Sequence, residues 1–414
     1  MPTRPALLTL AGMLLLAAAA AAPGIAHAFE VVLNAQGEYL DAYLVNGKPF
    51  PPRVAFIDPD PPDPACLPSD PACVPPRVGR HVNGKLCFFP RRAHRPGQFV
   101  LADDAYREAC LDSHPPQARC SVTDPKSPFF IGMDPDGWAI FDRSGKWTQE
   151  HIHTPWNFSG PQPQGNMDPQ GCVFDKKGRM FGNDVGTGAA GANNGSLIVF
   201  FPGKDRRYTT FCFLDKALSA PGMPAMDDDG NLYVPEPASA RLTKFSAPFP
   251  SSAADCDNPE HLVTTPPVKS GFFTGDRGGL VIPVSIVRAP HTKHWYVAGV
   301  VLPPIINEYD AKGAFVRNIV PANVPKNPLG MDVGHDGTLY YAELNLDPVT
   351  LDTRCGSVSM VRFDRHRQPQ PPVTLGKNLR FPDGVTVVRS SRFSVDFRQL
   401  PPSPDLTPGE CGGE

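Results

Sequence analysis

Residues 330–341 read Gly-Met-Asp-Val-Gly-His-Asp-Gly-Thr-Leu-Tyr-Tyr. An apolar stretch leads into a turn that contains Asp and Gly, and a second apolar stretch begins directly after it. Asp and Gly tolerate the positive φ of a tight turn, and the alternation on either side fixes which residues face each other. This segment therefore predicts a β-hairpin.

The same pattern returns along the chain. Segments 131–141, 171–181 and 226–234 repeat it closely, and segments 284–298 and 383–391 follow it less well. Candidate third and fourth strands follow several of these hairpins: 196–201, 241–245, 305–309, 357–363, 208–213 and 315–320. The turn glycines recur at intervals of roughly 40 to 60 residues, a spacing typical of repeat architectures.

One hairpin with one or two outer strands in each period is the content of a propeller blade. A blade cannot bury both of its faces alone, so the repeats must close into a ring. We therefore predict an all-β chain folded as a single β-propeller of six blades. Five blades would come from about 128–395. The sixth would come from 29–120, with strands at 30–33 and 99–101, and the C-terminal hairpin would pair with the N-terminal strand. A β-sandwich, or two small sheet domains, is the alternative.

The composition agrees with short strands and many turns. The chain has 51 prolines and 37 glycines among 414 residues, which puts proline at about twice its usual frequency of roughly 5%. Proline is poorly tolerated inside helices, and no stretch shows a long 3.6-residue apolar period. The net charge of −3, with 20% charged residues, argues against nucleic acid or an anionic membrane surface as a partner.

The first 28 residues have the pattern of a secretion signal. Arg4 is followed by the apolar run 7–22 and by the small-x-small site 26–28. An uncleaved membrane helix is the alternative, and no later segment approaches the length of a membrane span. We predict an exported protein, periplasmic or extracellular, with a propeller domain over 29–400. Its Pro-rich loop insertions would lie near 57–80 and 247–276, before a tail over 401–414.

All ten cysteines lie beyond residue 28. An even number in an oxidising compartment predicts disulfides. The best local pairing is Cys66 with Cys73, and the second is Cys110 with Cys120. A zinc or redox interpretation would need a C-x-x-C or a Cys/His cluster, and the sequence has neither.

The repeated strand, Asp-x-x-Gly turn and Leu-Tyr-type strand is similar to the NHL-repeat and SMP-30/gluconolactonase/LRE-like group of six-bladed propellers. Residues 328–343 resemble that group most, followed by 381–386. In its lactonase members the resemblance implies one divalent cation, usually calcium, near one end of the central channel. The ligands would be an early Glu and Asn or Asp residues just before inner strands. Such a cation could polarise a lactone or ester carbonyl and activate a water.

The resemblance gives three candidate metal ligands in this chain. Asp383 stands in a Pro-Asp-Gly sequence ahead of a predicted inner strand, and Asn166 and Asp168 lie near a second such place, where Gln170 would be a weak donor. Leu329 occupies a position where the group commonly has Asn. Asp and Asn also cap turns between strands, which is the alternative role for these residues. Glu30 would stand for the early Glu.

His151 and His153 are the candidates for catalysis. On a strand both rings would face one side, spaced for a shared metal or for acid–base work; exposed strand histidines are the alternative. The loop 183–194 could line a ligand pocket or simply connect two strands. Glu236 and Glu343 follow predicted second strands and could contact the channel or end a strand.

Three functions follow from these residues. The first is a calcium- or other metal-dependent hydrolase acting on a small lactone or ester at the channel mouth. The second is a non-catalytic propeller that binds a protein, glycan or small ligand. The third is an oxidoreductase with a quinone or copper cofactor, which would depend on His151 and His153.

Overall fold

The computed structural model describes residues 30–36, 39–44, 54–55, 82–103, 137–142, 147–154, 168–186, 193–256, 258–346, 355–379 and 382–389. These residues form the strands β1 to β24 and three short 3-10 helices. None of the helices among them has the length and apolar character needed to cross a membrane. The predicted signal 1–28, loop 57–80 and tail 401–414 lie outside the described residues.

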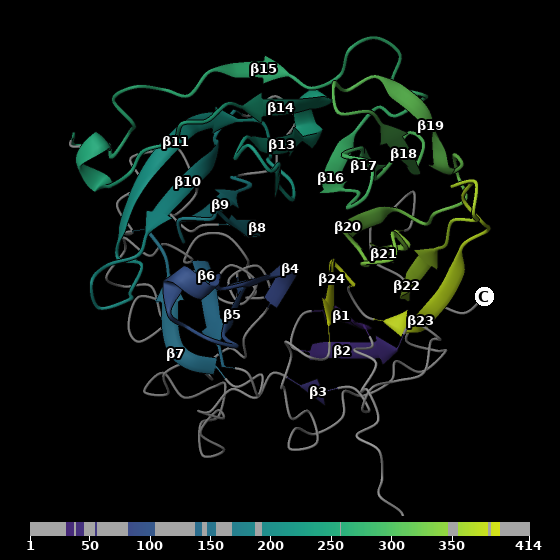
Figure 1. Cartoon of the computed structure of the whole chain (residues 1–414), viewed down its shortest axis with the longest axis horizontal. Coiled ribbons are helices and arrows are strands. Elements are labelled where there is room, and N and C mark those ends of the chain that lie inside the picture. The colour runs from purple at the N-terminus through teal and green to yellow at the C-terminus, as the bar shows by residue number, and fades with distance from the viewer. Residues whose placement is uncertain are drawn as a thin grey trace, which may run out of the picture.

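The strands make six four-stranded sheets arranged around one axis (Figure 1). Five of the sheets are blades, each built from four consecutive strands. Blade 1 contains β4 (Val82–Phe88), β5 (Phe99–Asp103), β6 (Gly137–Phe141) and β7 (Trp147–Ile152). Blade 2 contains β8 (Pro169–Phe174), β9 (Met180–Asp184), β10 (Gly195–Phe201) and β11 (Thr210–Leu218).

The remaining blades follow in chain order. Blade 3 contains β12 (Ala225–Met226), β13 (Leu232–Glu236), β14 (Arg241–Phe245) and β15 (Lys269–Gly271). Blade 4 contains β16 (Pro283–Arg288), β17 (Trp295–Gly299), β18 (Ile305–Tyr309) and β19 (Phe315–Val320). Blade 5 contains β20 (Pro328–Val333), β21 (Leu339–Glu343), β22 (Gly356–Val361) and β23 (Val373–Leu379).

The sixth sheet joins the two ends of the described chain. It orders β24 (Gly384–Arg389), β1 (Glu30–Gln36), β2 (Tyr39–Leu44) and β3 (Val54–Ala55). Val32 pairs with Val387 in the antiparallel β1–β24 ladder. The all-β propeller is thus confirmed, as is its closure by pairing of the N-terminal strand with the C-terminal one. The predicted count of six agrees with the structure only if this composite sheet counts as a blade.

Two strand assignments were wrong. Strands 30–33 and 99–101 do not share a blade, because β1 pairs with β24 and β4 begins a separate sheet with β5. The segment 137–141, expected as the second arm of a hairpin, is the third strand of blade 1; the first arm falls outside the described residues.

The hairpin turns show why the Asp-x-x-Gly pattern predicted strands so well. Asp175 accepts hydrogen bonds from the backbone N–H groups of Lys177 and Arg179, at 2.8 and 2.9 Å. Gly178 completes the turn at φ +90°, a conformation that favours glycine. Asp227 and Asp310 hold their turns in the same way. The sequence pattern therefore encodes a side-chain clamp as well as a flexible corner.

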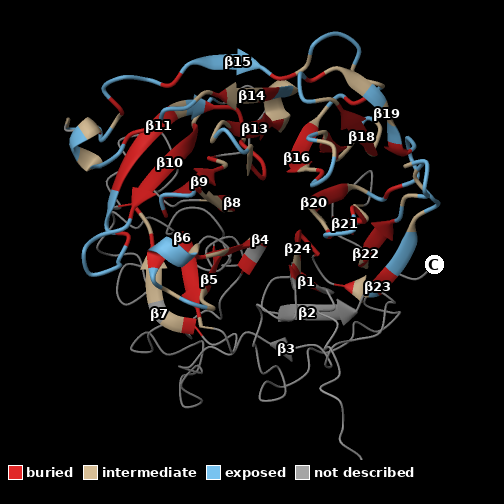
Figure 2. Ribbon diagram, viewed as in Figure 1, coloured by how far each residue is buried: buried red, intermediate tan, exposed pale blue. Residues whose placement is uncertain are grey.

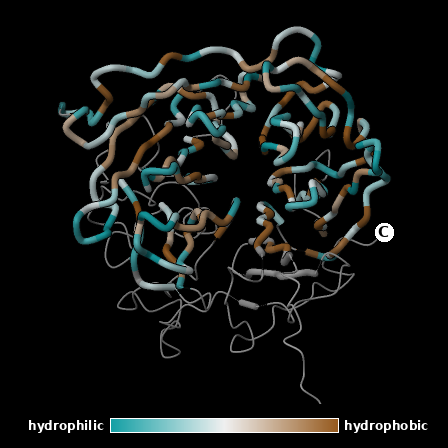
Figure 3. Tube along the Cα trace, in the orientation of Figure 1, coloured by the Kyte–Doolittle hydropathy of each residue, from teal (hydrophilic) through white to brown (hydrophobic). Residues whose placement is uncertain are grey.

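The burial of each strand depends on its position within its blade. Most inner and middle strands are largely buried, whereas the outer strand β15 is exposed and the outer strands β19 and β23 mix exposed with buried residues (Figure 2). The loops along the outer edge are mostly hydrophilic (Figure 3). β11 is an exception among outer strands, because the chain around the helix η3 (Ala253–Cys256) covers it: Phe213 exchanges backbone hydrogen bonds with His261 and Val263.

Disulfides tie the ring at two described places. Cys87–Cys172 joins the inner strands β4 and β8, and Cys212–Cys256 joins β11 to η3. Cys355 is disulfide-bonded as well. The predicted pairs Cys66–Cys73 and Cys110–Cys120 lie outside the described residues. Segment 247–276, predicted as a loop insertion, holds both η3 and the outer strand β15. Two further helices, η1 (Arg91–Ala93) and η2 (Pro237–Ser239), complete the fold.

Candidate functional site

A buried acid ends the second strand in four of the five blades. Asp103, Asp184, Glu236 and Glu343 are each the last residue of that strand, and each is at most 6% exposed. Three of them fix the chain that enters the blade, since they accept the backbone N–H of Asp168, Ser219 and Lys326 respectively. The carboxylates of Glu236 and Glu343 therefore anchor the entry to the inner strands, so these two residues do more than end a strand.

The same rim is closely packed at the axis. A Cβ on Gly330 would lie 3.0 Å from the sulfur of Met223, and one on Gly84 would lie 4.0 Å from its methyl carbon. Met223 is 3% exposed, and its backbone N–H donates to Val284 of blade 4. Met223 thus lies among inner strands of several blades. Neither its position nor its packing was evident in the sequence, because a lone Met outside a strand pattern carries no signal.

The predicted ligand Asp383 is at this rim and is 2% exposed. Its Oδ2 accepts the backbone N–H of Gly84 at 2.5 Å, and its carbonyl accepts that of Gly330 at 2.8 Å. Asp168 is half-buried, donates its N–H to Asp184 and accepts that of Val185. Asn166 lies outside the described residues. Both aspartates thus hold the chain at blade entries, which is the capping role considered as the alternative.

A second axial acid escaped the sequence prediction. Asp332 of β20 binds the Lys85 ammonium of β4 at 2.8 Å and accepts the backbone N–H of Val387 in β24 at 2.9 Å. This ion pair joins three inner strands. Asp332 lies in a segment that was predicted as part of a hairpin, and Lys85 lies in a segment without a motif. Nothing in the sequence therefore suggested that the two side chains form an ion pair.

The described axial residues do not by themselves assemble a calcium site. Calcium takes six to eight oxygen ligands. Here Asp383 and Asp332 already accept backbone N–H groups, and an ammonium lies against Asp332. Leu329, at the position where the resembled group has Asn, packs in an apolar cluster and is 6% exposed. No three His, Cys, Asp or Glu residues of the described part lie together as a metal-binding group.

The candidate catalytic histidines do not share a site through their described contacts. His151 lies in β7 with its Nε2 3.1 Å from Asp103 Oδ2, and its ring lies 5.2 Å from that of Trp147. His153 follows the strand, and its Nδ1 lies 3.1 Å from the carbonyl of Thr154. His151 therefore belongs to a buried His–Asp pair.

The predicted pocket loop at 183–194 begins with a structural contact. Asn183 is fully buried, accepts the N–H of Gly171 and donates to the carbonyl of Pro221. It therefore connects the inner strand β8 to the chain that enters blade 3. Residues 187–192 of this loop lie outside the described part.

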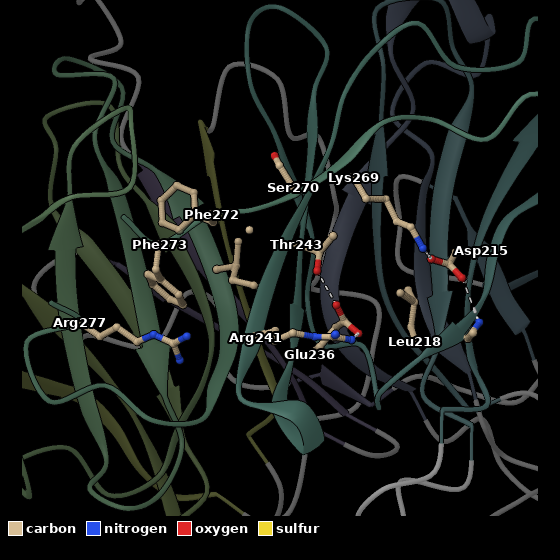
Figure 4. A pocket seen from close by; sticks show the side chains of 13 residues that line it. Asp215, Leu218, Glu236, Arg241, Thr243, Lys269, Ser270, Phe272, Phe273 and Arg277 are labelled. Carbon is tan, nitrogen blue, oxygen red and sulfur yellow. Dashed lines mark hydrogen bonds and ion pairs between the residues drawn. The ribbon is translucent and has the colours of Figure 1, made fainter. Parts of the chain in front are cut away.

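A cleft lies between β11 of blade 2 and the strands β13, β14 and β15 of blade 3 (Figure 4). It has a volume of about 360 Å³. Lys269 and Asp215 lie on one side, Phe273 and Arg277 on the other, and the middle strand β14 runs between them (Figure 4). We call this site the blade-3 cleft.

Two ion pairs organise the charges in the blade-3 cleft. Lys269 lies 2.7 Å from Asp215, and Arg241 lies 2.9 Å from Glu236. Both carboxylates are buried, at 8% and 1% exposed, whereas the two cationic side chains are about half exposed at 52% and 57%. Glu236 also accepts the hydroxyl of Thr243. The acids are therefore neutralised beneath the surface, and the cations face the open side.

The far side of the cleft combines an aromatic ring with a third cation. The Arg277 guanidinium lies 4.7 Å from the centre of the Phe273 ring, and its Nη1 donates to the carbonyl of Ala240 at 2.7 Å. The Arg277 carbonyl accepts the hydroxyl of Tyr309 at 2.7 Å. Burial raises the pKa of Tyr309 to about 12, so this phenol keeps its proton and remains a donor. The site could not be predicted from the sequence, because its residues come from two blades and from a connecting segment without a strand pattern.

No family model matches the chain, and no curated protein resembles it by sequence. Solved structures similar to it include a protein from Lactobacillus plantarum, with a TM-score of 0.47 and 10% identity over 87% of this chain and 100% of the other. A gluconolactonase from Xanthomonas campestris has a TM-score of 0.40 and 11% identity over 76% and 82% of the two chains. The calcium-binding protein regucalcin from Agrobacterium tumefaciens has a TM-score of 0.41 and 16% identity over 74% and 75%.

The last two names belong to the group that the sequence motifs resemble. Identities and TM-scores at this level carry no inference about activity, because propeller folds serve many unrelated functions.

Proposed function

We propose that this chain is a β-propeller that binds a small molecule in the blade-3 cleft. The observation that supports it most is the cleft itself: a concave site of about 360 Å³, within the range of ligand pockets of roughly 300–1,000 Å³. Its lining combines the rings of Phe272 and Phe273 with five charged side chains, so it is more polar than most small-molecule pockets. This corresponds to the second function considered from the sequence, the non-catalytic binding propeller.

Blocking the cleft should abolish binding. Gly271 lines it, and a Cβ added there meets no atom within 4 Å, so the position accepts a side chain, and we chose Gly271→Trp to obstruct the cleft. We expect fragments from a fluorinated library that bind the wild-type protein in ligand-detected ¹⁹F NMR to lose their binding in Gly271→Trp. Val373→Trp is the control, since Val373 is 49% exposed on the outer strand of blade 5. Fragment binding unchanged by Gly271→Trp would refute the proposal.

A metal-dependent lactone or ester hydrolase remains the alternative from the sequence resemblance. We expect EDTA, followed by excess calcium, to leave the thermal midpoint within about 1 °C of its starting value. A site that binds the folded state and is filled at a hundredfold excess over its Kd would add roughly 2.7 kcal/mol, a clear upward shift. A calcium-dependent rise that Asp383→Asn removes, together with turnover of a lactone, would favour the hydrolase.

We also propose that the protein is exported to the periplasm or the extracellular space. The disulfides Cys87–Cys172 and Cys212–Cys256 support this location, because disulfides persist in oxidising compartments. The N-terminal signal pattern supports it independently.

A further inference from the structure

The cations in the blade-3 cleft outnumber its carboxylates. Lys269 and Arg241 each have an acidic partner. Arg277 has none among the described residues: its side chain makes one hydrogen bond, to the carbonyl of Ala240, and lies over the Phe273 ring. The cleft therefore carries one positive charge that no protein carboxylate balances.

Arg277 is held in place before any ligand arrives. Its carbonyl accepts hydrogen bonds from the Tyr309 hydroxyl at 2.7 Å and from Asn307 Nδ2 at 2.9 Å. Tyr309 and Asn307 are both fully buried in blade 4, so the backbone at Arg277 is fixed from beneath. The guanidinium is fixed by Ala240 and Phe273. A group ordered in advance loses little conformational freedom on binding, which favours affinity.

The donors that remain on Arg277 define what it can bind. A guanidinium has five N–H donors and no acceptor, and the protein uses one of them here. Its planar fork matches the paired oxygens of a carboxylate, phosphate or sulfate group. Lys269 and Arg241 add positive charge along the same cleft.

The aromatic lining defines the rest of the ligand. Phe273 is half-buried and lines the cleft beside the buried Phe272. The rings lie next to the guanidinium, so a ligand whose oxyanion binds Arg277 would place its body against apolar surface. We propose that the blade-3 cleft binds an organic oxyanion, such as a carboxylate or a phosphate or sulfate ester, attached to a planar or apolar body, with Arg277 as the anion-binding residue. This inference rests on the proposed function.

The test compares two probes of equal shape, 2-naphthoate and its neutral amide, 2-naphthamide, by isothermal titration calorimetry. We expect the wild-type protein to bind the naphthoate at least tenfold more tightly. Arg277→Gln should weaken naphthoate binding roughly ten- to hundredfold, the effect of losing a hydrogen bond to a charged group, and leave naphthamide binding within about threefold. Arg277→Lys should fall between the two, because Lys lacks the planar fork.

The controls separate this inference from the proposed function. Arg365→Gln removes an exposed arginine on the turn after β22 and should leave the affinities for both probes unchanged. Naphthamide binding by Arg277→Gln shows that the cleft of that variant is intact. Equal wild-type affinity for both probes, or a naphthoate preference that survives in Arg277→Gln, overturns the oxyanion assignment. The oxyanion assignment is also overturned if neither probe binds while library fragments still bind the wild-type protein and fail to bind Gly271→Trp. If no probe or library fragment binds the wild-type protein in a way that Gly271→Trp abolishes, the proposed function itself is refuted.

Discussion

Gly384→Ala should lower the free energy of unfolding by about 3 kcal/mol or more, at the upper end of overpacking effects. A Cβ on Gly384 would lie 1.6 Å from the carbonyl oxygen of Gly84 and 2.6 Å from the backbone nitrogen of Lys85. These atoms are backbone atoms of β4, so no side chain can rotate away to make room. The inner strands β24 and β4 would have to separate where the ring closes. Urea denaturation followed by intrinsic fluorescence measures the loss.

The control for this variant is Gly271→Ala. A Cβ on Gly271 meets no atom within 4 Å, and alanine restricts the unfolded chain more than glycine does. We therefore expect its stability to be unchanged or to rise by about 0.4–1 kcal/mol. A Gly384→Ala protein as stable as Gly271→Ala would show that β24 and β4 are not in close backbone contact.

Removal of Cys87–Cys172 should have the second largest effect. The disulfide joins residues 85 positions apart in sequence, and closing a loop of that size restricts the unfolded chain by about 4.5 kcal/mol in the chain-entropy model. We expect Cys87→Ala/Cys172→Ala to lose about 2–5 kcal/mol, the range measured for native disulfides. The measurement is the urea midpoint under non-reducing conditions.

Cys212→Ala/Cys256→Ala is the matched comparison. Its loop spans 44 positions, so the chain-entropy model gives a loss smaller by about 0.6 kcal/mol. If Cys87→Ala/Cys172→Ala unfolds at the wild-type urea concentration, the bond between β4 and β8 does not form in the protein. If Cys212→Ala/Cys256→Ala loses more stability than Cys87→Ala/Cys172→Ala, native-state strain or residual structure in the unfolded chain outweighs loop length.

The blades that the sequence predicted best are those whose hairpins are local. β8–β9 and β20–β21 are joined by short turns with Asp and Gly, so hydrogen bonds within a few residues encode them. Blade 1 was predicted poorly because β5 and β6 pair across a long segment. No local pattern records such a partner, and segment 99–101 was assigned to the blade of segment 30–33 for the same reason.

The candidate site was harder to predict than the fold. Asp383 was found because a short motif marks the start of an inner strand, although its described contacts are those of a cap. Arg277 and Phe273 come from a segment without a strand pattern, and Glu236 was expected to contact the channel or to end a strand, not to line a cleft between blades. These residues come together only because blades 2, 3 and 4 lie side by side. The spacing of residues along the chain does not contain that information.

The pairing of β1 with β24 has a consequence for how the molecule assembles. Gly84 and Asp383 bind each other although they are 299 residues apart in sequence, so this seam forms only after nearly the whole chain has left the ribosome. Until then blades 1 and 5 each present an uncovered face to water and to other unfinished chains. Long-range closure of this kind is slow and prone to aggregation. Conditions that delay synthesis or release of residues 384–389 should therefore lower the yield of native protein more than equal delays earlier in the chain.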